Sequence, residues 1–395
     1  MKMNQISKLD ETYYGDIMDL SQYAFQYRLS EEELAAKKEQ MSNHTVWGWL
    51  ENEQLAAKVH VIPLKAYIQG EIMKMGGVAS VASWPEYRRG GKVKQLLKKA
   101  LQEMKTKGQI ISYLHPFSVP FYRKYGWEIT FDKADCKIPI RSLKKRWDGI
   151  GFVKRGNNND QTISMLDNIY TEYASSFTGP LVRDQHWWKH RILNKDDFIA
   201  IAYHDDHTPE GYIVYNVKDH IFTVKDIAFS TLNGQKLLLQ YMHDHDSMAD
   251  DIVVSLPIND GMTLLVEEPR FEQKVTPYFM SRIVDAGAFL AQFPYKKSDH
   301  FSTFAIHIED QFLPENTGVY QLSMNDHDEM KFDQVDKRDS LPTVTMNIQQ
   351  MAQIFLGYKR PHELSRLELL DGDQKAIGQL EEIIPTSHTY FPDFF

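Results

Sequence analysis

Residues 78–127 constrain the fold of this chain more than any other segment, because they place a glycine turn and an amphipathic helix between two apolar strands. Small and β-branched residues over 77–83 predict a buried strand, and residues 109–114 predict a second one. Between them, apolar side chains recur at the spacing of one helix face, and these are Val93, Leu96, Leu97, Ala100, Leu101 and Met104. The segment is therefore predicted to form a βαβ unit, which binds ligands beyond the carboxyl ends of its strands.

The turn before this helix has the composition of an anion site. Gly90 and Gly91 let the backbone approach a phosphate closely, and the unpaired amides of the first helical turn favour negative charge. Arg88 and Arg89 add charge-assisted hydrogen-bond donors. An Arg-x-x-Gly turn by itself is equally compatible with a solvated basic turn before a surface helix. Because a βαβ unit encloses this one, we predict that it binds phosphate.

Length and charge limit the classes of protein to consider. At roughly 150 residues per domain, a chain of 395 residues suggests two or three domains. The net charge of -9 argues against a general nucleic-acid binder and favours cationic substrates. No apolar run approaches the roughly 18 residues that span a bilayer, and no signal-peptide core is present. The single cysteine, Cys136, is expected to be a small core residue, so we predict a cytoplasmic protein without disulfides or a membrane span.

The chain is predicted to divide into three units. The first covers residues 1–145, and its strand and helix pattern recurs over residues 146–282. The corresponding turn of the second unit, residues 230–236, has too few donors to hold a pyrophosphate, so we expect a second fold without its own cofactor. Residues 283–395 predict a small α+β domain, whose apolar faces could be packed core or a lipid-holding cleft.

The order of these parts resembles the enhanced intracellular survival (Eis) type of multi-domain GCN5-related N-acetyltransferases (GNATs), over essentially the whole chain. The resemblance rests on Pro85-x-x-Arg88-Arg89-Gly90-Gly91, Phe121-Tyr122-x-x-Tyr125-Gly126-Trp127, Arg183-x-x-x-Trp187-Trp188-x-x-Arg191 and the aromatic chain end. It implies a fold class of α/β and α+β: two tandem GNAT-like folds, the second degenerate, and then a sterol-carrier-protein-like (SCP2-like) domain. It also implies a homohexamer. The third motif is expected to be a helix that buries both tryptophans.

The same resemblance implies acetyl-CoA as a substrate and assigns residues to its parts. Backbone groups of Val81, Ala82 and Ser83 would bind the pantetheine arm and the acyl group. The pyrophosphate would be held by Arg88, Arg89, Gly90, Gly91, Lys92, Val93 and Lys94. Phe117 and Ser118 would line the far side of the cofactor. We expect the amine to enter an open acidic pocket where the first two units meet, with residues 25–28 in its wall.

Acetyl transfer from a thioester to an amine needs a neutral amine, a polarised carbonyl and a protonated leaving thiolate. A backbone N–H near Val81 can polarise the carbonyl. Tyr122 matches the family's tyrosine acid, which protonates the sulfur, and Tyr125 is its nearest rival. The family's terminal-carboxylate base would here belong to Phe395. The four aromatic residues among the last seven favour a buried chain end, which could equally be a plug that only anchors the tail.

Two histidine and aspartate strings, 204–207 and 243–246, resemble metal ligands, but adjacent ligands on one short segment seldom converge, so we expect no metal. The sequence thus predicts an acyltransferase that moves acetyl from acetyl-CoA directly, in a ternary complex, to a primary amine. The amine would belong to a small cationic substrate, aminoglycoside- or polyamine-like, or to lysine. The alternative is a non-catalytic CoA- or lipid-binding protein that uses the SCP2-like domain.

Overall fold

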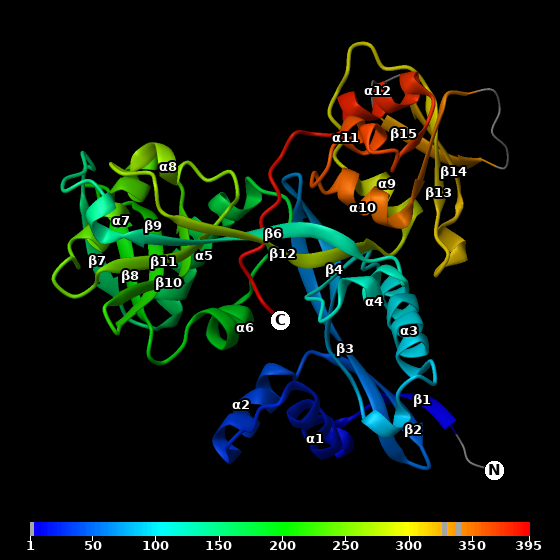
Figure 1. Cartoon of the computed structure of the whole chain (residues 1–395), viewed down its shortest axis with the longest axis horizontal. Coiled ribbons are helices and arrows are strands. Elements are labelled where there is room, and N and C mark those ends of the chain that lie inside the picture. The colour runs from blue at the N-terminus through cyan, green and yellow to red at the C-terminus, as the bar shows by residue number, and fades with distance from the viewer. Residues whose placement is uncertain (1–3, 326–329, 336–340) are drawn as a thin grey trace.

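The computed structural model describes residues 4–325, 330–335 and 341–395, which form three units (Figure 1). The first unit contains β1 (Asn4–Leu9), η1 (Glu11–Tyr13), α1 (Tyr14–Phe25), α2 (Glu31–Gln40), β2 (Thr45–Glu51), β3 (Gln54–Ile68), β4 (Glu71–Ser83), η2 (Pro85–Tyr87), α3 (Lys92–Thr106), β5 (Ile111–Leu114), α4 (Val119–Arg123), β6 (Glu128–Pro139) and η3 (Ile140–Ser142). Its βαβ unit of β4, α3 and β5 is the one predicted from the sequence.

The second unit repeats this plan of strands and helices. It contains β7 (Phe152–Gly156), α5 (Asp160–Ser175), α6 (Gln185–Trp187), the π-helix η4 (Trp188–Ile192), β8 (Phe198–Tyr203), β9 (Pro209–Lys218), β10 (Ile221–Phe229), α7 (Leu232–His243), β11 (Asp251–Leu256), α8 (Met262–Leu265) and β12 (Glu272–Ile283). The helix expected to bury two tryptophans is α6 with η4, and Trp187 and Trp188 are both buried. Cys136 in β6 is buried too, as predicted for a core residue.

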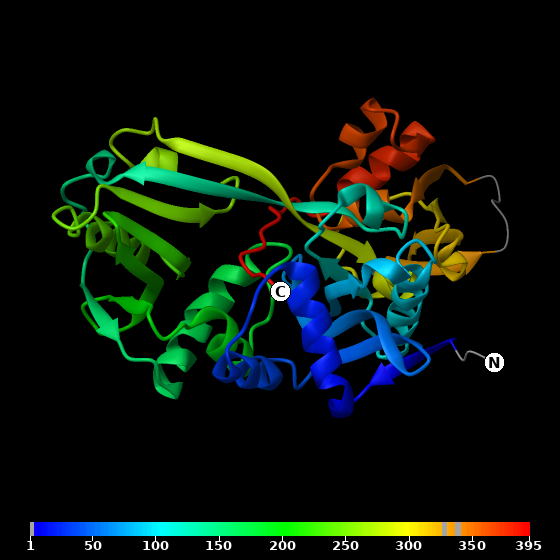
Figure 2. The same ribbon diagram turned by 60° about the horizontal axis from the view of Figure 1, so that its bottom comes forward.

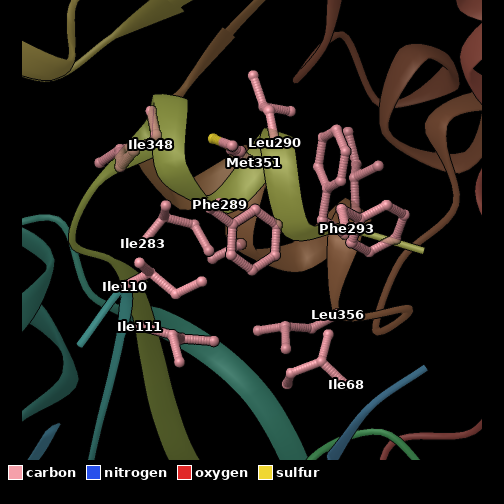
Figure 3. Close-up of a cluster of buried hydrophobic side chains, with 14 of the residues drawn as sticks. Ile68, Ile110, Ile111, Ile283, Phe289, Leu290, Phe293, Ile348, Met351 and Leu356 are labelled. Carbon is pink, nitrogen blue, oxygen red and sulfur yellow. The ribbon is translucent and has the colours of Figure 1, made fainter. Parts of the chain in front are cut away.

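The third unit pairs a small sheet with helices. It contains α9 (Ala286–Gln292), β13 (Phe304–Glu309), η5 (Pro314–Asn316), β14 (Gly318–Met324), β15 (Met330–Val335), β16 (Thr343–Asn347), α10 (Ile348–Phe355), α11 (Pro361–Arg366), β17 (Asp371–Gly372) and α12 (Gln374–Ile383). Its apolar faces are packed core, because side chains of α9 and α10 meet those of β5 and β12 (Figure 3). The buried residues at this contact include Ile110, Ile111, Ile283, Phe289, Leu290, Ile348 and Met351.

Two long antiparallel strands join the first and second units. Within the described residues, twelve strands form one sheet in the order β1-β2-β3-β4-β5-β12-β6-β11-β10-β9-β8-β7. β12 pairs with β5 over residues 280–283 and with β6 over residues 272–281, so it completes the sheet of the first unit from a distant part of the chain. Both strands extend from one half of the molecule into the other in Figure 1. Because β6 and β12 belong to the sheets of both units, the strands do not mark where one unit ends. The unit boundaries at residues 145 and 282 therefore stay a prediction.

Helix α3 covers one face of the sheet, and the chain end covers the other. Leu96, Leu97 and Met104 of α3 are buried, and Met104 lies against Gly76 of β4. The side chain of Phe395 packs on Gly77, where an added Cβ would lie 2.8 Å from the phenyl ring. Since neighbouring residues of a strand face opposite sides, the tail lies on the face opposite α3.

The aromatic tail is buried for most of its length. Tyr390, Phe391 and Phe395 are buried as predicted, but Phe394 is 56% exposed. Hydrogen bonds tie the tail to the second unit, since Thr178 donates its backbone N–H to His388 and accepts one from Tyr390 at 3.0 Å each. In Figure 2 the chain end lies between the blue helices of the first unit and the green helices of the second.

Candidate active site

The carboxyl ends of β4 and β5 separate, and this opens the candidate site. The two strands pair in parallel only through residues 75–77 and 111–113, although β4 continues to Ser83. A bulge lies in this continuation, because Lys58 of β3 pairs with Ala82 while His60 pairs with Ala79. Ser80 in the bulge has a φ of 49°. The bulge removes residues 80 and 81 from the ladder with β3, so backbone groups of Val81 are available to a ligand.

A pocket of about 720 Å³ lies at this separation, within the usual size range for a ligand site. It contains most of the residues predicted to bind acetyl-CoA. Its walls are formed by Ala24, Phe25, Val81, Ala82, Ser83, Tyr87, Arg88, Arg89, Gly91, Lys92, Val93, Lys94, Phe117, Phe121 and Tyr125. Gly90 and Ser118 were predicted but lie outside this set, whereas the sequence reasoning missed Ala24, Tyr87 and Phe121. All three lie directly beside segments that the sequence reasoning had already assigned to the site. Their position next to those segments was the signal that could have identified them.

The start of α3 leaves its backbone donors free for an anion. Gly91 caps the helix in a left-handed conformation, with a φ of 74°, and no side chain caps the first turn. Arg88 and Arg89 are exposed, and none of the described residues forms an ion pair with them. The ammonium of Lys92 instead lies 2.9 Å from the carboxylate of Glu51. Lys92 is therefore positioned to contribute its backbone N–H to the site.

Two tyrosines of the same loop differ in their positions. Tyr122 is buried at 3% exposure among the rings of Phe117, Phe121 and Trp127, and it does not line the pocket. Tyr125 lines the pocket directly. Burial raises the pKa of both phenols, so both stay protonated at neutral pH and can only donate a proton. Of the two candidate acids, Tyr125 thus lines the pocket, whereas Tyr122 packs against Phe117 and Phe121 in the pocket wall.

Lys58 and His60 of β3 are candidates that the sequence reasoning missed. Lys58 is fully buried beneath the bulge, and its Nζ lies 2.6 Å from Ser80 Oγ and 3.0 Å from His60 Nε2. Burial lowers the pKa of Lys58 well below its ordinary value. A lysine and a histidine two positions apart in an otherwise apolar strand were the signal, because they share one face. That face is the one on which the tail packs.

The pocket at the junction of the first two units differs from the acidic pocket predicted from the sequence, because its wall is mostly basic and contains none of residues 25–28. This pocket of about 340 Å³ has the side chains of Lys65, Lys74, Lys107 and Arg183 in its wall, with Asp184 as the acidic residue. Of these, Arg183 pairs with Asp226 and Asp393. Nearby, burial and then the charge of Arg191 lower the pKa values of Lys37 and His44. The net charge of the chain is an average over all surfaces, and it does not fix the charge of one cleft.

Among the residues that the structure describes, no group of three or more His, Cys, Asp or Glu side chains is arranged to hold a metal ion. Among their helices, none combines the length and the apolar character needed to cross a bilayer.

Three families of domain match the chain. An acetyltransferase (GNAT) domain matches residues 5–130, a second acetyltransferase (GNAT) domain matches residues 179–283, and a sterol carrier protein domain matches residues 286–392. An uncharacterized N-acetyltransferase of Streptomyces avermitilis is 20% identical over 205 residues, which are 49% of each chain. The chain therefore spans about half the length of this curated relative.

Solved structures resemble the whole chain. A probable N-acyltransferase from Enterococcus faecalis V583 has a TM-score of 0.92 and 26% identity, with all of both chains covered. A GCN5-related N-acetyltransferase from Anabaena variabilis has a TM-score of 0.88 at 20% identity, and Eis1 from Mycobacterium abscessus has 0.81 at 19%, again over the full length of each chain. At such identities the latter two are evidence of fold alone.

Proposed function

We propose that this chain, which carries two acetyltransferase (GNAT) domains followed by a sterol carrier protein domain, is an acyltransferase that moves acetyl from acetyl-CoA to a primary amine. The predicted fold class is confirmed by these matches. One observation supports the activity most: a pocket at the separated ends of β4 and β5 combines free backbone donors at the start of α3 with two unpaired arginines. This is the arrangement that a diphosphate and an acyl arm require.

The second GNAT domain supplies an internal comparison. Its helix α7 corresponds to α3, but the Thr231 hydroxyl already accepts a hydrogen bond from the Gly234 N–H at 2.9 Å. The carboxylate of Glu210 also lies at this turn, where it accepts a hydrogen bond from Asn233. A capped helix start beside a carboxylate disfavours a diphosphate. We therefore assign acetyl-CoA binding to the first domain.

In the proposed reaction, the pyrophosphate lies on the start of α3 and the thioester reaches the bulge of β4. A backbone N–H near Val81 donates to the thioester oxygen as charge develops there. The amine attacks directly, without an acyl-enzyme, and Tyr122 protonates the departing sulfur. The carboxylate of Phe395 accepts the proton that the amine loses. The resemblance further implies aminoglycoside-like, polyamine-like or lysine acceptors, a cytoplasmic location and a homohexamer, and all of these stay predictions.

Thiol release from acetyl-CoA, measured with a panel of primary amines, tests the proposed function. We expect turnover with at least one amine and none with the corresponding tertiary amine. Calorimetric binding of acetyl-CoA without turnover on any amine would favour the alternative, a CoA- or lipid-binding protein. If acetyl-CoA does not bind at all, the pocket is neither an acetyltransferase site nor a CoA-binding site.

Replacing Arg88 and Arg89 together with glutamine should raise the KM for acetyl-CoA at least about 100-fold and leave kcat nearly unchanged, because charge-assisted hydrogen bonds contribute about 1.5–3 kcal/mol each and about 1.4 kcal/mol is a factor of ten. Steady-state kinetics at saturating amine measure this effect. The double replacement of Lys98 and Lys99, exposed on the same helix, removes equal charge and serves as the control. Equal KM values for the two double variants would contradict the assignment.

Adding one glycine after Phe395 should reduce kcat at least about 10-fold, since it moves the carboxylate proposed as the base away from the amine. The buried ring of Phe395 fixes the position of this group between Gly77 and Trp187. Replacing exposed Phe394 with serine is the matched control, because it changes the tail without moving its end. Full activity of the extended chain would show that the terminal carboxylate is not the base and that the tail only anchors the chain end.

A further inference from the structure

A group of basic side chains lies on the acceptor side of the bulge, where α2 of the first unit meets α6 and η4 of the second. The two units are joined there by hydrogen bonds: Gln40 Nε2 donates to the His190 carbonyl at 3.0 Å, and a ring nitrogen of His186 lies 3.4 Å from the Glu39 carbonyl. Lys37 is held in place by its own bond to Gln40 at 2.8 Å. The contact between units therefore gathers positive charge.

A second set of basic side chains lies between this contact and the bulge of β4. The ring nitrogens His44 Nδ1 and His60 Nδ1 lie 3.5 Å apart, and His60 contacts the amine of Lys58, which in turn bonds Ser80. Arg191 lies over the ring of Trp187, with 5.4 Å from its guanidinium carbon to the ring centroid. The charges of Arg191 and Lys37 act on His44, so the two sets of basic side chains are neighbours.

The carboxylates around this group do not balance it. Among the described residues, no carboxylate forms a salt bridge with Lys37, Lys58 or Arg191. Glu39 is exposed and pairs loosely with His190 at 3.8 Å. Asp393 is a buried acid whose charge acts on Arg191, but its carboxylate already bonds Arg183 and Trp187 at 3.1 and 2.7 Å. Partly buried charges are normally paired with an opposite charge. A guanidinium and an ammonium that no carboxylate of the described residues pairs with therefore favour the binding of an anion.

Electrostatic strain within the group supports the same conclusion. Burial and the charge of Arg191 lower the pKa of Lys37 to about 8, and burial with the surrounding cations lowers the pKa of His44 to about 3. A bound anion would relieve this repulsion. It would also explain why the cations are gathered beside the bulge, where the acetyl group is to be transferred.

We propose that the acceptor of this enzyme is an amine that also carries an acid group, a carboxylate or a phosphate monoester, and that Lys37 and Arg191 bind this acid. The inference rests on the proposed function, because it identifies the class of acceptor. The acid fixes the acceptor in the cleft, and the amine at its other end faces the bulge. Cationic acceptors such as polyamines would meet a like charge and are disfavoured.

Calorimetric titration of the CoA-loaded full chain, with three probes of equal length, tests this proposal directly. The probes are 6-aminohexanoate, 6-aminohexanamide and 1,6-diaminohexane, and shorter members of the same series locate the best span. A fourth comparison, 2-aminoethyl phosphate against ethanolamine, separates a phosphate site from a carboxylate site. We expect an acid-bearing amine to bind at least about 10-fold more tightly than its neutral or cationic match, as charge-assisted pairs with Arg and Lys do.

Arg191→Gln and Lys37→Gln should each reduce this preference about 10-fold, whereas Lys189→Gln should retain it. Lys189 lies on the same segment as Arg191, but its ammonium is exposed and pairs with Asp160 at 2.8 Å. Two separate variants keep the test decisive if one of them fails to fold. Equal or weaker binding of every acid-bearing probe, or a preference that survives in both variants, would overturn the proposal.

Thiol release, recorded with the same probes, separates this proposal from the proposed function. Selective binding of acids without any thiol release would support the anion subsite and contradict the acetyltransferase activity. Thiol release without any preference for acids would support the acetyltransferase activity and contradict the anion subsite.

Discussion

Replacing Tyr122 with phenylalanine should lower kcat about 100-fold or more, the usual contribution of a general acid, and leave acetyl-CoA binding unchanged. The variant removes one oxygen from a ring that is held by Phe117, Phe121 and Trp127, so the packing should persist. Because burial raises the pKa of this phenol, it stays protonated up to high pH and can donate to the thiolate throughout the working range. Single-turnover kinetics at saturating acetyl-CoA and amine measure the effect.

Tyr125→Phe is the matched control, since it makes the same change at the neighbouring tyrosine that lines the pocket. We expect its kcat to fall less than about 5-fold, as for a residue that contributes only contact. A larger loss of kcat in Tyr125→Phe than in Tyr122→Phe would identify Tyr125 as the general acid. Equal and small effects of both would show that the sulfur takes its proton from water.

Arg183→Met should destabilise the protein by about 3–5 kcal/mol, because it leaves two buried carboxylates without their cation. Arg183 is 5% exposed, and it donates to Asp226 at 2.7 and 3.0 Å and to Asp393 at 3.1 Å. Asp393 belongs to the tail, so this network ties the chain end to the second unit. The midpoint of urea unfolding, followed by circular dichroism, measures the loss.

Arg270→Met is the control for charge removal, because Arg270 and its partner Glu268 lie at the surface with 2.8 Å between them. Its unfolding midpoint should match that of the unmodified protein, as exposed ion pairs contribute little. If Arg183→Met unfolds at the same urea concentration as the unmodified protein, the buried carboxylates become protonated without a loss of stability. Loss of turnover in Arg183→Met at temperatures where it stays folded would further link the network to the position of the tail.

Local patterns in the sequence predicted the parts of the site that local physics determines. The spacing of apolar residues located α3, and the glycine turn located the free donors at its start, because both depend on neighbours in the chain. The buried tail followed from its aromatic content. The exposure of Phe394 did not, since an aromatic residue facing solvent has no signature of its own.

Features that depend on distant partners could not be predicted. Lys58 of another strand hydrogen-bonds Ser80 in the bulge, and Glu51 of β2 pairs with the ammonium of Lys92. The basic junction arises where α2 meets η4, about 150 residues further along the chain, and composition averages such a patch away. These contacts are set by tertiary packing, which periodicity does not report.

The insertion of β12 between β5 and β6 has a consequence for how the protein is made. The sheet of the first unit lacks an inner strand until the ribosome has synthesised residues 272–283. Until then one edge of β5 and one edge of β6 lack this partner, and unpaired strand edges can pair with other chains. We therefore expect the first GNAT domain to aggregate when it is produced without β12.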